Sequence, residues 1–509
     1  MSLVSSIFHL PILAALLILF IPRNFKFVIR CVALLSTLVS LILAIVLFCK
    51  FDASKAGDGF QFVAQHAWVK SLGISYHVGV DGINLGLILM GSAVLFAAVC
   101  VARQIKNREK EFYFLLLLMG GGILGAFASL DLFFLYFFHE LALVPTFIMI
   151  GLWGRGEDKN YATFQITLYL SAGALLVLLG LLGVYLQMPP PQRTFDLVAM
   201  TQYFQAHPMA AAPQRLLFPA LLFGFGTLVS LWPFHTWAPL GYGSAPTPTA
   251  MIHAGVLKKF GLYGLIRVAL PMMPYEAQRW ANILVVLCLG NILYVGLVAI
   301  RQRDLNLLIG NSSVAHMGFA FLGLASLRLI GITGTVVIMI AHGFLAALTF
   351  ALSGYLRDEL QTTDMDRMGG LLRKLPFIGT VMIMAMLAGC GVPGFANFPG
   401  ELLVLFGSWQ HFEWITALAV WGALVIGAVY MLRAIRRIWH GEKEWPAIRD
   451  VLGPWQKLPY ALLLTCLLVF GCFPRLLTDN IKASAAPIVR MVGAEPIELP
   501  PVAKENFHK

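Results

Sequence analysis

The chain has 509 residues, of which 59% are hydrophobic and only 12% are charged, and its formal net charge at pH 7 is +11. Soluble domains carry about 25% charged residues, so this chain has too few charges to cover a soluble globule of its size. The composition excludes a soluble multidomain protein, a disordered chain and a secreted disulfide scaffold, and it predicts an all-α polytopic membrane protein. A transmembrane barrel is disfavoured, because barrel strands alternate polar and apolar residues and this chain has long apolar runs.

The net charge and the cysteines suggest no nucleic-acid or metal chemistry. In an apolar chain a positive balance is typical of basic loops on one side of a membrane, so no nucleic-acid partner is expected. The seven cysteines lie mostly in apolar runs and form no CxxC pair, and they are interpreted as buried small apolar residues. The start of the chain lacks a basic segment and a clear cleavage motif, so no cleavable signal peptide is expected.

Fourteen apolar stretches are long enough to cross a bilayer. A hydrocarbon core about 30 Å thick needs roughly 20 apolar residues in a helix, and the chain is therefore predicted to form about 14 transmembrane helices. The stretches are residues 3–21, 31–49, 82–102, 112–129, 132–153, 162–187, 216–232, 247–266, 280–300, 307–327, 329–354, 377–409, 414–432 and 458–474.

Two connecting loops are long, and the chain ends in a polar tail. Residues 50–80 end in an alternating, glycine-flanked run, which predicts a small β-hairpin. Residues 188–215 are rich in proline and alanine, which predicts irregular structure. The tail after Leu477 is polar and is expected to lie on the outer surface.

The basic residues predict the orientation. Loops after odd-numbered stretches hold 21 of the 36 Lys and Arg residues, and loops after even-numbered stretches hold 8. Because cytoplasmic loops carry an excess of Lys and Arg, the odd-numbered loops are predicted to be cytoplasmic and both termini to be outside. Most of the signal comes from the clusters Arg103–Lys110 and Arg433–Lys457.

Four full charges lie inside apolar stretches, namely Glu140, Lys258, Lys259 and Glu401. Each costs ~2.5–3.5 kcal/mol at a helix centre, so a role is expected for them. A structural ion pair or a side chain reaching the membrane surface is the alternative, but Glu140 lies well inside its stretch. Lys258 and Lys259 are about 100° apart on a helix, so the two are not expected to face one point.

Histidines accompany these charges at similar depth. A single buried histidine is more often structural, whereas several beside carboxylates and lysines favour a proton relay, because imidazole gives and takes protons near neutral pH. Ser312 precedes one of these histidines by four residues and shares its helix face. The histidines are His139, His235, His253, His316 and His342.

Proline and glycine interrupt two of the stretches. The seventh ends in the sequence LWPFHTW at residues 231–237, and the twelfth contains GCGVPGFANFPGE at 389–401. Paired broken helices are typical of transporters with inverted repeats. Their spacing predicts two inverted five-helix repeats, with helices 7 and 12 broken. The predicted domains are 1–110 with helices 1–3 and the hairpin, 111–275 with helices 4–8, 276–440 with helices 9–13, and 441–509 with helix 14 and the tail.

No nucleotide-binding loop, haem ligand pattern, iron–sulfur cysteine set or hydrolase triad is visible, so no redox centre is expected in this chain. Several stretches together carry a specific resemblance across nearly the whole chain. They are HVGVDGINLGLI (77–88), HELALVPTF (139–147), GLWG (151–154), PFHTWAP (233–239), APTP (245–248), AGVLKKFGLYG (254–264), SSVAHMGF (312–319), MIAHG (339–343) and FANFPGELLVLFGS (395–408).

In these stretches the sequence resembles the antiporter-like subunits of respiratory complex I, the proton-pumping NADH–quinone oxidoreductase, and is most similar to their subunit M group. The resemblance implies a fourteen-helix protein with a membrane-embedded proton channel and no cofactor of its own. NADH, flavin, iron–sulfur clusters and quinone would be held by partner subunits. The implied relay residues are Glu140, Lys259, His316, His342 and Glu401, to which the analysis of charges adds Lys258 and His235.

The sequence departs from the family pattern at several positions. The family normally places a lysine in the seventh helix to pair with the fifth-helix glutamate, and here that position is Leu228. The usual Asp-Ala-His after the broken helix reads Leu240-Gly241-Tyr242. Either Glu140 stays largely protonated, or another group supplies the missing positive charge; Lys258 is favoured over His139 because its stem is long.

The sequence therefore predicts a multi-pass, proton-translocating subunit of a complex I-type assembly in a bacterial inner membrane, partnered by other membrane subunits and the lipid bilayer. Redox chemistry in those partners would drive a buried Glu/Lys/His relay. An antiporter-like subunit of a cation/proton antiporter or a membrane-bound hydrogenase is one alternative. A non-pumping scaffold subunit is another, because Leu228 replaces the family lysine.

Overall fold

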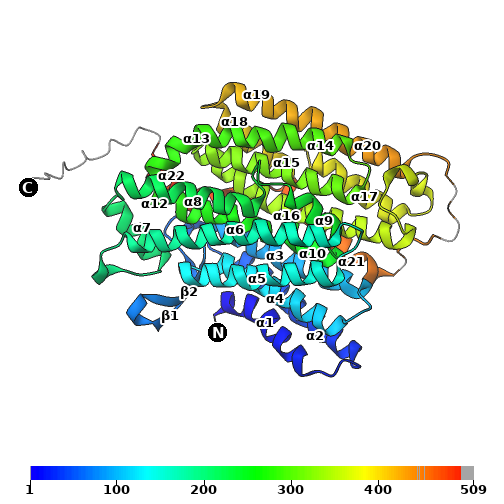
Figure 1. The fold of residues 1–509 in the computed structure, drawn as a ribbon, viewed down its shortest axis with the longest axis horizontal. Helices are drawn as coiled ribbons and strands as arrows, with labels where there is room; N and C mark the ends of the chain where they lie inside the picture. The colour runs from blue at the N-terminus through cyan, green and yellow to red at the C-terminus, as the bar shows by residue number, and fades with distance from the viewer. Residues whose placement is uncertain (1, 444, 446–447, 452, 494–509) are drawn as a thin grey trace, which may run out of the picture.

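The computed structural model describes residues 2–443, 445, 448–451 and 453–493. Within these ranges, 12 helices are long and apolar enough to cross a membrane. They run side by side along the long axis of the molecule (Figure 1), and the predicted all-α polytopic class is confirmed.

Ten of these twelve helices are uninterrupted, and two contain a π-helical turn. The uninterrupted ones are α1 (Leu3–Phe20), α2 (Lys26–Lys50), α3 (Gly82–Val101), α4 (Glu109–Ala128), α5 (Leu132–Trp153), α6 (Lys159–Leu186), α8 (Ala211–Val229), α15 (Leu305–Ala325), α16 (Leu329–Leu360) and α21 (Pro454–Cys472). The other two combine α13 (Pro274–Leu289), η7 (Gly290–Val295) and α14 (Gly296–Arg301), and α19 (Glu413–Trp421), η10 (Gly422–Gly427) and α20 (Ala428–Trp439).

The eighth and twelfth predicted stretches are built from short pieces. The eighth, predicted as 247–266, comprises α10 (Thr247–Gly255), the 3-10 turn η5 (Leu257–Lys259) and α11 (Phe260–Gly264), and the chain continues beyond it through the π-helical turn η6 (Leu265–Ala269) and α12 (Leu270–Met272). The twelfth contains α17 (Pro376–Gly389) and α18 (Asn397–Trp409). The exact number of membrane crossings and the two five-helix repeats stay predictions.

The break after the seventh stretch has a local cause. Helix α8 ends at Val229, and Ser230 adopts a φ of +69°, in the left-handed region that ends helices. Pro233 follows, and its ring leaves no backbone N–H to continue a helix. The chain resumes as α9 (Trp237–Ser244).

Side-chain caps begin several helices. The Asp81 carboxylate accepts hydrogen bonds from the backbone N–H groups of Ile83 and Asn84 and starts α3. Asp131 does the same for α5, immediately after the short turn that ends α4. These acceptors satisfy N–H groups that have no partner inside the helix.

Helices α3, α15 and α16 lie at the centre of the bundle. In their membrane-length windows 89%, 94% and 100% of the residues are buried, against 33%, 39% and 28% for α2, α6 and α21. A helix buried all round must satisfy its polar side chains inside the protein, so polar residues on α15 and α16 are the ones with interior partners.

The predicted hairpin is confirmed, and one other segment differs from expectation. Strands β1 (Gln61–Val69) and β2 (Ile74–Val80) pair antiparallel. The expectation that residues 188–215 are irregular was wrong, because Asp196 caps a helix there, α7 (Leu197–Ala206). The tail contains α22 (Arg475–Val492), one face of which is buried against the bundle, and residues 494–509 lie outside the described part.

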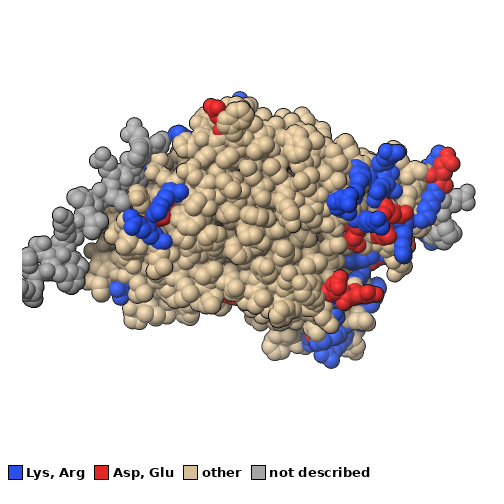
Figure 2. Space-filling view, turned by 45° about the horizontal axis from the view of Figure 1, so that its top comes forward, with Lys and Arg blue, Asp and Glu red and all other residues tan. Residues whose placement is uncertain are grey.

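The hairpin, α7, α12 and α22 lie at one end of the molecule (Figure 1), hereafter the hairpin end. On the face shown in Figure 2, Lys and Arg side chains gather mainly at the opposite end. The tan region between the two ends carries few charges, as expected for the part that faces lipid.

Candidate functional site

Lys259 lies at the break between α10 and α11, and its side chain is completely buried. Its Nζ donates to the backbone oxygen of Ala254 at 2.5 Å, and it lies 2.9 Å from Nδ1 of His342 on α16. The change from α-helix to 3-10 turn at this point leaves carbonyls available to the ammonium group. A hydrogen bond therefore joins Lys259 to His342.

His316 on α15 continues this connection. Its ring centroid lies 5.5 Å from that of His342. Its Nδ1 lies 2.8 Å from the backbone oxygen of Ser312, and its Nε2 lies 3.1 Å from the backbone oxygen of Gly389. Gly389 is the last residue of α17. The break in the twelfth stretch therefore leaves its backbone carbonyl facing the imidazole of His316.

Glu401 on α18 completes the group. Its Oε1 lies 3.8 Å from Nε2 of His316, and the residue is 9% exposed. A cavity of about 10 Å³ between them is lined by Tyr430 as well, and one water needs roughly that volume. The structure thus brings together four residues predicted from the sequence, in the order Lys259, His342, His316 and Glu401, hereafter the buried chain.

The glycine at position 391 makes room for the Glu401 carboxylate. A Cβ atom on Gly391 would lie 2.5 Å from Oε2 of Glu401, and its φ of +68° suits glycine. The glycines of the twelfth stretch therefore position the acid as well as breaking the helix.

Lys258 points to a different place from Lys259, as expected from their spacing. Its Nζ donates to Oγ of Ser313 at 3.2 Å and lies 5.6 Å from the ring centroid of Tyr242. The Tyr242 hydroxyl lies 3.2 Å from Nδ1 of His253. All of these residues are buried, so a second polar group extends from α10 and η5 to α15.

The sequence analysis missed Tyr242 and Tyr430 as members of these groups. Tyr242 occupies the position where the resemblance predicts a histidine. This departure from the family pattern was the one feature of the sequence that could have drawn attention to Tyr242. Tyr430 Oη lies 3.2 Å from Oγ of Ser312, but a tyrosine in an apolar helix gives no sequence signal of that contact.

Glu140 is not part of the buried chain. Its side chain is 32% exposed on the outer face of α5. Among the described residues its ion pair is with the adjacent His139, at 3.4 Å, and no lysine lies within ion-pair distance. The favoured pairing of Lys258 with Glu140 is therefore not observed; the lysine binds Ser313 instead.

His235 and Leu228 lie near the break after α8. His235 is buried in the turn before α9, its Nδ1 has no hydrogen-bond partner within the part of the chain that the structure describes, and its ring contacts Tyr294. No direct bond joins it to the buried chain in the described residues. Leu228 is buried and faces Gly173 on α6, where a Cβ would lie 3.3 Å from its Cδ2.

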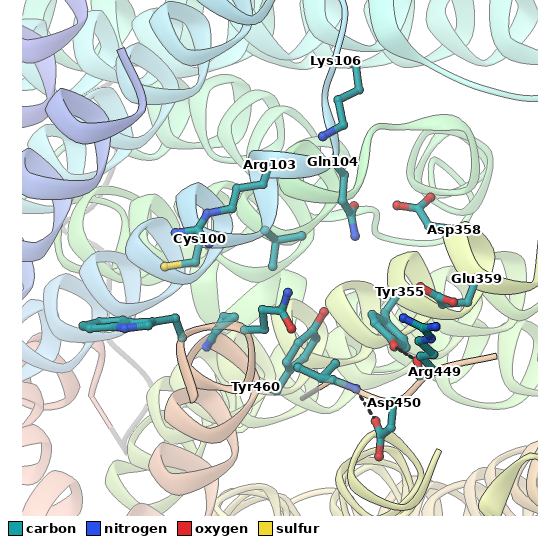
Figure 3. A pocket seen from close by; sticks show the side chains of 15 residues that line it. Cys100, Arg103, Gln104, Lys106, Tyr355, Asp358, Glu359, Arg449, Asp450 and Tyr460 are labelled. Atoms are coloured by element: carbon teal, nitrogen blue, oxygen red, sulfur yellow. Dashed lines mark hydrogen bonds between the residues drawn. The ribbon is translucent and has the colours of Figure 1, made fainter. Parts of the chain in front are cut away.

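A pocket of about 560 Å³ lies at the end opposite the hairpin, between α3, α16 and α21 (Figure 3). Basic and acidic side chains line it in equal number: Arg103, Lys106, Arg449, Asp358, Glu359 and Asp450. No predicted relay residue lines this pocket. In the described ranges no cluster of three or more His, Cys, Asp or Glu residues could hold a metal ion.

A family model and curated relatives of this chain point to the same protein family. The model of the family described as NADH:quinone oxidoreductase/Mrp antiporter, transmembrane, matches residues 129–427. The chain is 31% identical to NADH-quinone oxidoreductase subunit M of Rhodobacter capsulatus, covering 97% of this chain and 98% of the relative. It is 34% identical to subunit M of Rickettsia conorii, covering 93% and 96% respectively.

Two solved structures share the fold. A chain of respiratory complex I from Thermus thermophilus with bound NADH superposes with a TM-score of 0.87 at 27% identity, covering 96% of this chain and all of that one. A chain of the Mrp complex from a Dietzia species superposes with a TM-score of 0.82 at 18% identity, covering 97% and 100%, and shows likeness of fold alone.

Proposed function

The chain belongs to the NADH:quinone oxidoreductase/Mrp antiporter transmembrane family, and on that premise we propose that it is the proton-translocating subunit M of a complex I-type NADH–quinone oxidoreductase. Its partners are the other membrane subunits of that assembly. NADH, flavin, iron–sulfur clusters and quinone belong to those partners, and their redox reaction drives this chain.

The buried chain carries the proposal. It places an ammonium, two imidazoles and a carboxylate in one row through the centre of the bundle, each buried and each within one water of the next. Such a row has no evident structural use, because replacing buried charges by apolar residues is often neutral or stabilising. Proton transfer is the function that these groups perform together.

The transfer proceeds from group to group. A proton leaves Nζ of Lys259 and binds Nδ1 of His342, across their 2.9 Å hydrogen bond. It passes to His316 through a water or a small ring movement, since the ring centroids are 5.5 Å apart. It then moves from Nε2 of His316 to the Glu401 carboxylate, across a gap of 3.8 Å that a water closes.

The proposal includes the orientation and the repeats. The basic clusters Arg103–Lys110 and Arg433–Lys457 face the cytoplasm of a bacterial inner membrane, and the hairpin end faces outward with both termini. The gathering of Lys and Arg at one end of the face in Figure 2 supports this orientation. The units 111–275 and 276–440 form the two inverted repeats, each with one proline-containing break.

The proposal is tested with Glu401→Gln in the assembled complex. The amide keeps the size of the side chain but does not ionise, so protons translocated per electron should fall while NADH oxidation by quinone continues. The matched control is Glu413→Gln, an exposed glutamate in the first turn of α19, which should behave as wild type. An undiminished proton yield in Glu401→Gln would overturn the assignment.

A non-pumping scaffold is the second candidate. Leu228 and the lack of a lysine near Glu140 among the described residues favour it, because Glu140 then has only the adjacent His139 as an ion-pair partner in that part of the chain. Normal proton yield in both Glu401→Gln and Glu140→Gln would support a scaffold. Mass spectrometry of the subunits that co-purify in mild detergent identifies the parent complex and separates complex I from an antiporter or hydrogenase.

A further inference from the structure

The pocket of about 560 Å³ at the end opposite the hairpin has the size of a ligand site. It lies where three membrane helices end or begin, because α3 ends at Val101, α16 ends at Leu360 and α21 begins at Pro454. Lys and Arg side chains gather at this end of the molecule (Figure 2). The pocket therefore lies at the membrane surface, at the depth of lipid headgroups.

Two of the three acids that line the pocket already have partners within the protein. Asp358 forms an ion pair with Arg155 at 2.9 Å. The Asp450 carboxylate accepts hydrogen bonds from the backbone N–H groups of Phe377 at 2.6 Å and of Val451 at 2.8 Å. The equal number of acids and bases in the lining therefore does not describe the charge that a ligand would meet.

The three basic side chains of the pocket have no such partner. Arg103, Lys106 and Arg449 are exposed, and their side chains form no ion pair or hydrogen bond with any residue that the structure describes. Figure 3 shows that they come from different segments, two from the chain just after α3 and one from the chain before α21. Glu359 is the acid of the lining that is free in the same sense. Three free cations against one free carboxylate attract an anion.

The start of α21 adds to this attraction. Trp455 and Gln456, in the first turn of the helix, line the pocket. The residue before the helix is Gly453, which has no side chain to cap it. The first N–H groups of a helix lack partners inside it, and the positive end of the helix dipole lies there. A phosphate is stabilised at such a position.

The surroundings of the pocket suit a lipid. Trp455 is 73% exposed, and tryptophan at a helix end is typical of the interface between bilayer and water. In the membrane-length window of α21 only 28% of the residues are buried. Its outer face is thus an apolar surface that begins at the pocket and along which acyl chains can lie. A free phosphate would make no use of this surface.

Two further groups in the lining can accept hydrogen bonds. Oε1 of Gln104 is buried and has no hydrogen-bond partner within the described ranges. The carboxylate of Glu359 accepts hydrogen bonds when it is ionised. A headgroup that carries hydroxyls beside its phosphate would donate to both.

We propose that this pocket binds the headgroup of an anionic phospholipid of the phosphatidylglycerol type. Arg103, Lys106 and Arg449 hold the phosphate. Gln104 and Glu359 accept hydrogen bonds from the glycerol hydroxyls, and the acyl chains lie along α21. Basic pockets between membrane helices are known to bind anionic headgroups in this way. The inference goes beyond the proposed function and does not depend on proton transfer.

The first test counts bound lipid in the complex. The complex is purified in mild detergent, equilibrated with equal amounts of phosphatidylglycerol and phosphatidylethanolamine, and analysed by mass spectrometry. The wild type should retain phosphatidylglycerol, and Arg103→Gln/Arg449→Gln should lose it, with about tenfold weaker binding for each arginine removed.

The matched control is Arg373→Gln/Lys374→Gln, which also removes two exposed positive charges but does not touch the pocket lining. It should retain phosphatidylglycerol as the wild type does. Equal retention in the two double variants would overturn the site. Equal retention of the two lipids by the wild type would overturn the preference for a net negative headgroup.

The second test separates a lipid from a free anion and from a protein segment. Because a ligand stabilises the state that binds it, phosphatidylglycerol should raise the unfolding temperature of the wild type and of the control but not of Arg103→Gln/Arg449→Gln. Inorganic phosphate at the same concentration should have no effect, and a rise with phosphate alone would overturn the lipid assignment. A carbodiimide cross-link from Lys106 to another subunit, with no phosphatidylglycerol retained, would assign the pocket to an acidic protein segment instead.

Discussion

The Nε2 atom of His316 and the Oε1 atom of Glu401 are 3.8 Å apart, close enough for an ion pair but longer than a hydrogen bond. The imidazole is held at this distance by two backbone carbonyls, one on each side of its ring. A proton can therefore cross only when a water enters the small cavity or the carboxylate moves. This gap is the point of the buried chain most sensitive to small changes in packing.

Replacement of His316 distinguishes a relay from a structural histidine. His316→Phe should lower the proton yield more than His316→Gln, because glutamine keeps polar contact with water whereas phenylalanine excludes it. The same order is expected for His342→Phe and His342→Gln. The measurement is protons translocated per electron in the assembled complex. Equal and mild effects of both substitutions would indicate structural roles.

Gly391→Ala should displace the Glu401 carboxylate. The added methyl would lie 2.5 Å from Oε2, and the left-handed backbone adds roughly 1–2 kcal/mol of strain. We expect assembly with a reduced proton yield. Gly394→Ala is the matched control, because its φ is also positive, at +98°, but no atom lies within 4 Å of the added carbon. If both variants lose the same yield, strain in the loop explains the effect and displacement of Glu401 does not.

Lys258→Leu tests the second polar group. Loss of the ammonium removes the hydrogen bond to Ser313, and we expect a lower proton yield because the link between η5 and α15 is cut. Leu228→Lys should not restore it, since Leu228 faces Gly173 on α6. The measurement is the number of protons translocated per electron in the double variant Lys258→Leu/Leu228→Lys, compared with Lys258→Leu alone. Recovery in the double variant would show that Lys258 serves Glu140, and a silent Lys258→Leu would make Lys258 a bystander.

Asp131, in the turn between α4 and α5, should make stability depend on pH. Burial raises the pKa of its carboxyl from 3.8 to about 6, against the opposing effect of backbone hydrogen bonds. The folded state then holds a proton that the unfolded state releases, so stability falls as pH rises from about 4 to about 6 and stays lower above that. The penalty is on the order of 3 kcal/mol.

Asp131→Asn should remove this dependence while keeping the oxygen that caps α5. Thermal unfolding of the detergent-solubilised protein at pH 5 and pH 8 provides the measurement. The variant should gain on the wild type roughly twice as much at pH 8 as at pH 5. A gain of the same size at both values would contradict the assigned burial effect.

The sequence was sufficient for the fold class, the hairpin and the residues of the buried chain. These depend on signals of large free energy, because burying a charge or breaking a helix in a membrane is costly. Lys259, His316 and Glu401 could be picked out individually for that reason. Their order and distances could not, since these depend on how α11, α15 and α18 pack.

The features that could not be predicted have one cause in common: the residues around them give weak or ambiguous indications of structure. Helix α7 was missed because prolines and alanines around it suggest irregular structure, although Asp196 caps it. The partner of Lys258 was not predictable, because a flexible four-carbon stem reaches several groups. Arg267 lies one residue beyond the predicted stretch 247–266, and the π-helical turn η6 places it inside the protein.

The buried chain draws its members from segments that are far apart in the sequence. Lys259 follows α10, whereas Glu401 lies on α18. During biosynthesis the lysine therefore enters the bilayer well before the acid, and the row of polar groups is incomplete until α18 has been inserted. A chain made only as far as α16 holds Lys259, His342 and His316 without the acid that completes the row. An incomplete copy of the chain therefore lacks the carboxylate to which His316 would pass a proton.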